Sequence, residues 1–553
     1  MNFTLRKFML TGYIIFCSSI VMAENDYWEK LLHLDNNTSN IISENFYLSD
    51  TKNITAREEL LLSINYINSH KGQNFACNFP ARYLYLKKNY KVKKYSLKNC
   101  EELNNFYLDY DKKKLSLAFA SEYTNNPSSV FGHTMLILHN DYNDLEVGDV
   151  IHFFAHTNEE DRFFKYIVNG ITGKYESYYG TDKFFKKLYR YNTLQQRYIY
   201  VYTLDFSEEE IKKFLYHLYE LRKAKYEYYF GTINCAKKIF DLLSLIKKPN
   251  QKKYNLFFLP IDVIKSFEEY IIDEYTYLPL LYKIQNLTEN FENSDKILFD
   301  SILQGKEYEM ENLPNQFKLA LINKATFDFR FFRKVSKNYN KIMSLKYEDT
   351  TFIDKTINPI NKIYPKNLTI GLENGDLIFN YNTVGKYIND LSSDFTIQDT
   401  EVRALNVGFS TSNNLKIRNF DFVSINSFPT INFYYKPNSY LLYSGFNRNN
   451  KKKQLRFVNE IGYGKTYFNF NIFKSTILFS SGNEDNKLFI KPRIIFSKQF
   501  NKIKCGIDYY KKYSDSAKDF VSYEYYIGKK TDHNYFLVKY SDNKFSINTR
   551  FSF

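Results

Sequence analysis

The stretch from about Pro365 to Phe553 restricts the possible fold most. Apolar and polar residues alternate there in repeated segments, and turn-forming clusters such as 481–486 separate the segments. Alternation over about ten residues is typical of a β-strand with one apolar and one polar face. The clearest segments are LRFVNEIGYG, YFNFNIF, KLFIKPRIIFS, KIKCGIDYYKKY, SYEYYIGKK, YFLVKYSD and KFSINTRFSF. On the order of twelve strands are predicted, which indicates an all-β region.

Two all-β architectures have strands in which apolar and polar residues alternate in this way: the transmembrane β-barrel and the soluble β-sandwich. The segments here are rich in aromatic residues, and Ile547, Phe551 and Phe553 share one alternation. This ending resembles the C-terminal signal of outer-membrane barrels. We therefore favour a C-terminal outer-membrane β-barrel over 365–553.

The beginning of the chain favours the same location. Met1–Ala23 has Arg6 and Lys7 before the apolar run Phe8–Val21, and small or aliphatic residues precede the expected cleavage after Ala23. These are the parts of a secretory signal peptide, and the apolar run is short for a retained membrane helix. We expect an exported chain located at the bacterial outer membrane.

Composition narrows the possible partners. The formal net charge is +15, and 51 Tyr and 51 Phe are spread over all segments. A basic chain can bind nucleic acid or an anionic membrane surface. Since no groove-reading helix motif or Arg-rich arm is present, we expect a membrane partner and no nucleic acid.

A histidine and a cysteine far apart in the sequence carry the candidate chemistry. A turn-forming run at 125–129 leads to His133 and then to the apolar run Met135–Leu138, which predicts a strand beginning near His133. Cys235 begins a pattern with apolar residues at helical spacing. A thiol at a helix N-terminus is favoured as thiolate, and a histidine is its usual proton acceptor. The 102 intervening residues mean that only the fold can bring the two together.

Further histidines follow in the predicted second strand, 147–156, where His152 and His156 share a face. His152 is our candidate for orienting His133, and a structural or merely exposed histidine is the alternative. His133, His152, His156 and Cys235 are also possible zinc ligands. Because no short-spaced ligand pair accompanies them, we expect no metal and no other cofactor.

Three motifs occur in the same order as in a known family. The CxFPARY, FGHT and EL…Y…NC motifs together resemble the DUF4105 family, the periplasmic domain of Lnb-type lipoprotein N-acyltransferases, over about 24–260. The order of histidine before cysteine is also similar to the permuted papain-like group that contains lecithin:retinol acyltransferases. The resemblance implies an α+β, permuted papain-like (NlpC/P60-like) thiol domain. It also implies a phospholipid acyl donor and a lipoprotein acceptor.

Several residues are candidates for binding the substrate or the oxyanion. The loop residues Ser128 and Ser129, together with Asn234 and the backbone N–H of Cys235, are candidate donors. Tyr175 and Tyr178 lie in 170–180, which we expect to be a mobile loop over the site. Arg82 can bind an acidic group of the substrate, or it can form a structural ion pair.

The other cysteines have structural interpretations. Cys77 and Cys100 lie in one small region and are candidates for a disulfide in an oxidising compartment. Cys505 lies in an alternating run and is expected to fill a position in a strand.

The sequence predicts five regions: a signal peptide (1–23), a helical accessory domain (24–70), a Cys/His catalytic domain (71–260), a helical connection (261–364) and the barrel (365–553). Within the connection, a helix carrying Arg330 and Arg333 either rests on anionic lipid or packs with a solvated basic face.

The leading functional hypothesis is an envelope thiol acyltransferase acting on phospholipid or lipoprotein acyl groups. A cysteine peptidase or amidase acting on cell-wall peptides, and a non-catalytic outer-membrane binding protein, are the alternatives. The oligomeric state stays open.

Overall fold

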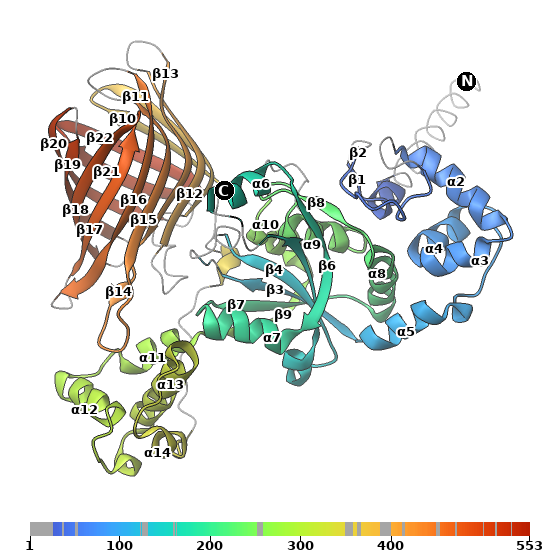
Figure 1. Ribbon diagram of the computed structural model, residues 1–553, viewed down its shortest axis with the longest axis horizontal. Coiled ribbons are helices and arrows are strands. Elements are labelled where there is room, and N and C mark those ends of the chain that lie inside the picture. Colours follow the sequence, from blue (N-terminus) through green and yellow to red (C-terminus); the bar gives the residue numbers. More distant parts are fainter. Residues whose placement is uncertain are drawn as a thin grey trace, which may run out of the picture. The chain divides into compact units, whose positions relative to one another are not determined.

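The computed structural model describes residues 26–35, 38–49, 54–121, 123, 131–158, 161, 163–250, 258–348, 358–361, 366–386, 400–411, 415–448, 454–469, 473–500, 503–514, 517–531 and 534–552. The predicted signal peptide lies outside these residues. The chain forms two compact units (Figure 1). Unit 1 comprises 1–120, 131–190 and 199–277, and unit 2 comprises 121–130, 191–198 and 278–553.

Unit 1 is built on an antiparallel sheet in the strand order β8-β6-β5-β4-β3-β7-β9. The strands are β3 (Lys114–Ala120), β4 (His133–His139), β5 (Asp149–His156), β6 (Tyr175–Lys183), β7 (Ile199–Leu204), β8 (Tyr226–Tyr228) and β9 (Ile271–Tyr277). The central strands β3, β4 and β7 are buried at almost every position. Such strands read as continuous apolar runs, because both faces of the sheet are covered.

Helices make up most of the rest of unit 1. They are α2 (Ala56–Asn68), α3 (Gly72–Asn78), α4 (Pro80–Asn89), α5 (Glu101–Tyr110), α6 (Phe163–Ile171), α7 (Phe184–Leu188), α8 (Glu208–Leu221), α9 (Cys235–Ser244) and α10 (Pro260–Ser266). A capping box begins α8: the Ser207 side chain accepts from the Glu210 N–H, and the Glu210 side chain accepts from the Ser207 N–H. Helix α9 packs against β4 and β5.

Pro80 begins α4, since a proline at the first helical position loses no hydrogen bond. Two local expectations were wrong. Residues 170–180 form the end of α6 and most of β6 instead of a mobile loop, because Tyr175, Ser177 and Tyr179 alternate toward the buried face. Residues 271–277, expected to be helical, form the edge strand β9 beside β7, so unit 1 continues beyond 260.

The amino-terminal helices are held by a disulfide and by one buried arginine. Cys77 of α3 and Cys100, which precedes α5, form the disulfide. Arg82 of α4 is fully buried, and its guanidinium lies 3.4 Å from Glu220 of α8 and 3.6 Å from Glu59 of α2. It also donates to the Phe46 carbonyl and lies over the Phe46 ring.

This network gives Arg82 the structural ion pair, which was one of its two expected roles, and contradicts the other, the binding of a substrate group. Its charge is neutralised within the protein, and no part of the side chain is accessible. The guanidinium instead joins α2, α4 and α8, which lie far apart in the sequence.

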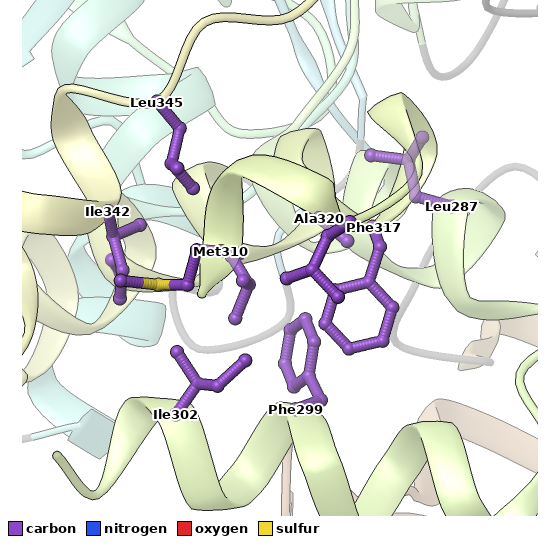
Figure 2. Packing of buried hydrophobic residues seen from close by; sticks show 11 residues of the cluster. Leu287, Phe299, Ile302, Met310, Phe317, Ala320, Ile342 and Leu345 are labelled. Carbon is purple, nitrogen blue, oxygen red and sulfur yellow. The ribbon is translucent and has the colours of Figure 1, made fainter. Parts of the chain in front are cut away.

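The helical part of unit 2 comprises α11 (Leu280–Thr288), α12 (Asn293–Leu303), α13 (Asn315–Phe332) and α14 (Tyr339–Met343). Its core gathers Phe299 and Ile302 of α12 against Phe317 and Ala320 of α13 (Figure 2). Among the helices that the structure describes, none is both long enough and apolar enough to cross a membrane. Helix α13 has the packed apolar face that was one of its two predicted arrangements.

The remainder of unit 2 is a closed barrel of twelve described strands (Figure 1). They are β10 (Asn367–Glu373), β11 (Asp376–Lys386), β12 (Thr400–Ser410), β13 (Lys416–Ser427), β15 (Ser439–Arg448), β16 (Leu455–Asn469), β17 (Phe473–Glu484), β18 (Lys487–Phe500), β19 (Ile503–Ser514), β20 (Ala517–Lys530), β21 (Asn534–Ser541) and β22 (Lys544–Ser552). Closure comes from the antiparallel pairing of β10 with β22 and of β16 with β17. The short strand β14 (Thr430–Ile431) pairs in parallel with Thr466 and Tyr467 of β16, beyond the residues of β16 that pair with β15.

The barrel follows the predicted alternation. Apolar residues such as Ile477, Phe479 and Ile547 remain 42–66% exposed on the outer face, and polar residues such as Asn548 point inward. Cys505 lies in β19 as expected, on the same alternation as the outward Ile507. An apolar exterior with a polar interior is the arrangement of a membrane-spanning barrel.

We predict that Arg82→Met destabilises unit 1 strongly, because it leaves Glu59 and Glu220 buried without their cation. The expected loss is about 3–5 kcal/mol. Urea unfolding of the full chain can be followed by the fluorescence of Trp28, the single tryptophan, which is 2% exposed in unit 1.

Arg222→Met is the matched control, since Arg222 pairs with the exposed Glu102 and should contribute at most about 1 kcal/mol. Equal losses in the two variants would contradict the proposed role of Arg82.

Candidate functional site

Cys235 is the first residue of α9, as the sequence predicts. Asn234 is the N-cap: its Oδ1 accepts from the Lys237 N–H at 3.1 Å. Its Nδ2 donates to the carbonyls of Phe230 at 3.0 Å and Phe258 at 2.8 Å. The amide thus uses both donor hydrogens within the protein, so the structure gives Asn234 a capping role instead of the expected oxyanion contact.

The thiol of Cys235 lies in a buried place beside strand β4. Cys235 is only 7% exposed. The backbone N–H groups of Thr134 and Ala236 are directed at the sulfur, and the Thr134 hydroxyl lies beside it without the geometry of a full hydrogen bond. These donors lower the thiol pKa, but burial outweighs them and raises it overall.

This outcome corrects the expectation that the helix N-terminus favours the thiolate. Transfer of a charged sulfur into an apolar interior costs more than the helix dipole and the nearby donors return. The thiol is therefore protonated at neutral pH, and a reaction at Cys235 requires a base.

Tyr228 of β8 borders the same site. Its hydroxyl lies close to the backbone N–H of Cys235, and burial raises its pKa well above the ordinary value. It is therefore a neutral hydroxyl next to an N–H that we had expected to serve as an oxyanion donor. Ser128 and Ser129, the other expected donors, lie outside the described residues.

His133 begins strand β4, one residue before Thr134. The preceding Gly132 has a φ of 94°, and a Cβ there would lie 2.5 Å from the Phe119 ring. Glycine is therefore required at this turn into the strand. The FGHT motif therefore places the start of β4 beside the thiol, and Thr134 is the residue of this motif that contacts the sulfur.

The pleat of the sheet separates the histidines from the thiol. Leu136 of β4 and Ile151 of β5 are register partners, so they share a face. By alternation Thr134 shares that face, whereas His133 and His152 leave from the opposite one. His133 is the first residue of β4, so a base role requires its side chain to turn around the end of the strand toward the thiol.

His152 lies within the opposite face. Its ring stacks on Phe154 at 4.7 Å, and it is paired with Gly180 of β6. Burial, followed by the positive charge of Lys187, lowers its pKa to about 4. His152 is therefore neutral near pH 7, which suits a hydrogen-bonding partner better than an acid.

The two candidate tyrosines of β6 lie on opposite faces of the sheet. The Tyr175 hydroxyl donates to Asp161 at 2.7 Å and is thereby occupied. Tyr178 packs edge-on against Phe154 at 4.4 Å, on the face that carries His152.

Sequence reasoning missed Thr134 and Tyr228, the two residues that border the thiol. Thr134 is part of the quoted FGHT motif, so its position directly after the candidate histidine was an available signal. Tyr228 lies in the run YEYYF, where neighbouring tyrosines hide any individual signal.

Two family models match parts of the chain that precede the barrel. Residues 102–270 match the family model described as the Lnb N-terminal periplasmic domain. Residues 21–89 match a domain of unknown function, DUF7843. Membership of DUF4105 itself stays a prediction. Among curated proteins, none matches the sequence significantly.

Several solved structures of outer-membrane proteins resemble the barrel. The NanC porin is 7% identical and the KdgM porin 8%, each matching over 34% of this chain and 98% of the porin, with TM-scores of 0.23 and 0.22. OmpT of Vibrio cholerae is 8% identical over 34% of this chain and 96% of its own, with a TM-score of 0.17. Such values bear on the fold alone, and we base nothing further on them.

The family match and the barrel together give the location. A closed barrel with an apolar exterior spans the outer membrane, and the matched N-terminal domain is periplasmic. The Cys235 site therefore lies in the periplasm, as expected.

We predict that Thr134→Val raises the thiol pKa further, because it removes the hydroxyl beside the sulfur and leaves the backbone N–H in place. In a Cys505→Ala background, the pH midpoint of iodoacetamide alkylation should rise by about half to one pH unit. The exposed Thr172→Val variant should keep the parent midpoint, and an unchanged midpoint in Thr134→Val would contradict the assigned contact.

We also predict that acid destabilises unit 1 through His152. The folded pKa of about 4 lies below the unfolded value of about 6.5. The unfolded chain therefore binds the proton first, and stability falls as the pH drops from about 6.5 toward 4, by on the order of 2–3 kcal/mol.

In His152→Gln this fall should be smaller than in the parent, whereas the exposed His70→Gln should match the parent. Urea titrations at pH 7 and pH 4.5, followed by Trp28 fluorescence, measure the difference. Parallel pH profiles for all three proteins would contradict the prediction.

Proposed function

We propose that this protein is an envelope thiol acyltransferase in which Cys235 forms an acyl-enzyme, with a phospholipid as acyl donor and a lipoprotein amine as acceptor. The observation that carries the proposal is the placement of a buried free thiol at the first residue of α9, with two backbone N–H groups directed at its sulfur. The same segment matches the Lnb periplasmic domain.

The donors around the sulfur support acyl transfer in particular. N–H groups directed at a thiolate stabilise negative charge as it develops, and they can also bind the oxygen of a tetrahedral intermediate. The raised thiol pKa keeps the nucleophile protected as a thiol until a base acts on it. We assign this base role to His133, whose chain position next to Thr134 brings the strand start to the thiol.

In the first half-reaction, His133 takes the proton from Sγ, and the thiolate attacks an ester carbonyl of the phospholipid. The S–C bond forms, the ester C–O bond breaks, and the lysophospholipid leaves with the proton. In the second, the acceptor amine attacks the thioester carbonyl. An N–C bond then forms, the S–C bond breaks, and Cys235 regains its proton from the amine through His133.

The fold class that we propose with this chemistry is the permuted papain-like one. An antiparallel sheet with the histidine on a strand, and a cysteine on a later helix packed against that strand, is the expected order of elements.

The test is intact-mass analysis of the purified full chain after incubation with phospholipid. We expect a gain of one fatty acyl group that hydroxylamine removes, because a thioester reacts with it. The gain should be absent in Cys235→Ala and present in Cys505→Ala, which removes the other free cysteine of the part of the chain that the structure describes.

His133→Ala should also abolish the adduct, whereas the nearby exposed His156→Ala should keep it. An adduct that forms but passes to water and never to an added peptide amine would indicate a phospholipase. If the unmodified protein forms no adduct with accessible lipid, the acyl-transfer proposal fails.

A further inference from the structure

The last turn of α13 leaves several large apolar side chains exposed together. Phe329, Phe331 and Phe332, with Val335 directly after the helix, are 38–61% exposed. Single exposed apolar residues are normal on a protein surface, whereas a group of them marks a contact with another molecule or with a membrane. We call these four residues the aromatic end of α13.

The same segment is strongly basic. Residues 329–347 contain six Lys or Arg and no Asp or Glu. Arg330, Arg333 and Lys334 are exposed, and none of the three forms an ion pair within the described part of the chain. Asp328, the acid that precedes them, pairs with Lys324 instead. The aromatic end is therefore interspersed with cations that the described carboxylates leave to other anionic groups.

The rest of α13 is packed within the helical part of unit 2. Phe317 and Leu321 belong to its main core. Phe327 is buried against Leu281 and Ile284 of α11. The two arrangements expected for this helix thus concern different stretches of it, because packing occupies its length and only its end is accessible to lipid.

A group of aromatic rings connects this end to the barrel. Phe327 lies 5.1 Å from Phe331 and 5.6 Å from Phe332, measured between ring centroids. The Phe327 ring also lies 6.0 Å from that of Tyr435, in the connection between β14 and β15. The aromatic end is therefore joined through one buried ring to this connection.

The connection lies at the periplasmic end of the barrel. The chain enters β10 from the helical part and the periplasmic domain before it, and since neighbouring strands are antiparallel, β15 begins at this same end. Ile431 of β14 is the register partner of Tyr467, which is 41% exposed on the outer face of β16. Outward aromatic residues are typical of the membrane interface. The four residues from Ile431 to Tyr435 span at most about 14 Å, so the aromatic end of α13 lies near that interface.

We propose that the aromatic end of α13 rests on the periplasmic surface of the outer membrane and binds the headgroups of anionic phospholipids. Aromatic rings favour the headgroup region, and Lys and Arg beside them are attracted to anionic lipid. Lys334 lies over the Phe332 ring at 5.9 Å, so the charged and the apolar groups meet the surface together. This inference does not depend on acyl transfer at Cys235.

The test is the quenching of a fluorescent bimane label by lipids that carry a nitroxide on the headgroup. The label is attached at Val335→Cys in a Cys235→Ala, Cys505→Ala background, and the full chain is reconstituted in liposomes with phosphatidylglycerol. We expect strong quenching, because a nitroxide acts only at close contact. Quenching should fall severalfold when phosphatidylcholine replaces phosphatidylglycerol, and also in high salt, which screens the attraction.

Arg330→Glu should lower the quenching severalfold, because it replaces attraction to the headgroups by repulsion. Lys318→Glu is the matched control: it makes the same charge change on the same helix, about 18 Å earlier along the axis, and should keep the parent quenching. Phe331→Ser combined with Phe332→Ser should lower the quenching with either lipid. Electrophoretic mobility without heating checks that each barrel is folded.

Two outcomes would overturn the proposal. One is equal quenching in the parent and in Arg330→Glu, which would leave the cations without a role. The other is a label that no nitroxide lipid quenches in the parent. If the emission of such a label shifted to the blue as the protein-to-lipid ratio rose, the occupant of this surface would be a second copy of the chain instead of lipid.

Discussion

The burial of the Cys235 sulfur against strand β4 is the interaction on which the candidate site depends. The N-cap at Asn234 fixes where α9 begins, and the packing of α9 on β4 and β5 fixes what the sulfur meets. A sulfur this enclosed gains selectivity at the cost of intrinsic reactivity, since desolvation disfavours its charged form. Any chemistry must supply both a base and a substrate that completes the apolar surroundings.

The pleat of β4 sets a second constraint. A strand sends consecutive side chains to opposite faces, so the residue that contacts the sulfur and the candidate base cannot both point directly at it. The first position of a strand is where this rule is weakest, because only one neighbour fixes the backbone there. The glycine at 132, held at a positive φ, determines how the chain turns into that position.

The sequence was most informative where one side of an element faces a uniform medium. In the barrel, lipid on one side and a polar interior on the other impose strict alternation, so the strands could be predicted. The capping box of α8 and the helix at Cys235 rest on equally local rules. The sequence was less informative where distant segments decide: β9 is a strand because β7 offers an edge, and Arg82 is buried because Glu59 and Glu220 meet there. No local pattern contains these partners.

The two ways in which the sheets are completed have different consequences for assembly. The seven-stranded sheet of unit 1 ends with β9, before the first barrel strand in the chain, so all its partners exist once Tyr277 has been made and exported. The barrel closes only when β22 meets β10, the pairing most separated in sequence. Such non-local pairing is slow and leaves unpaired edges exposed meanwhile. The periplasmic part can therefore be fully folded while the barrel strands still need protection from aggregation.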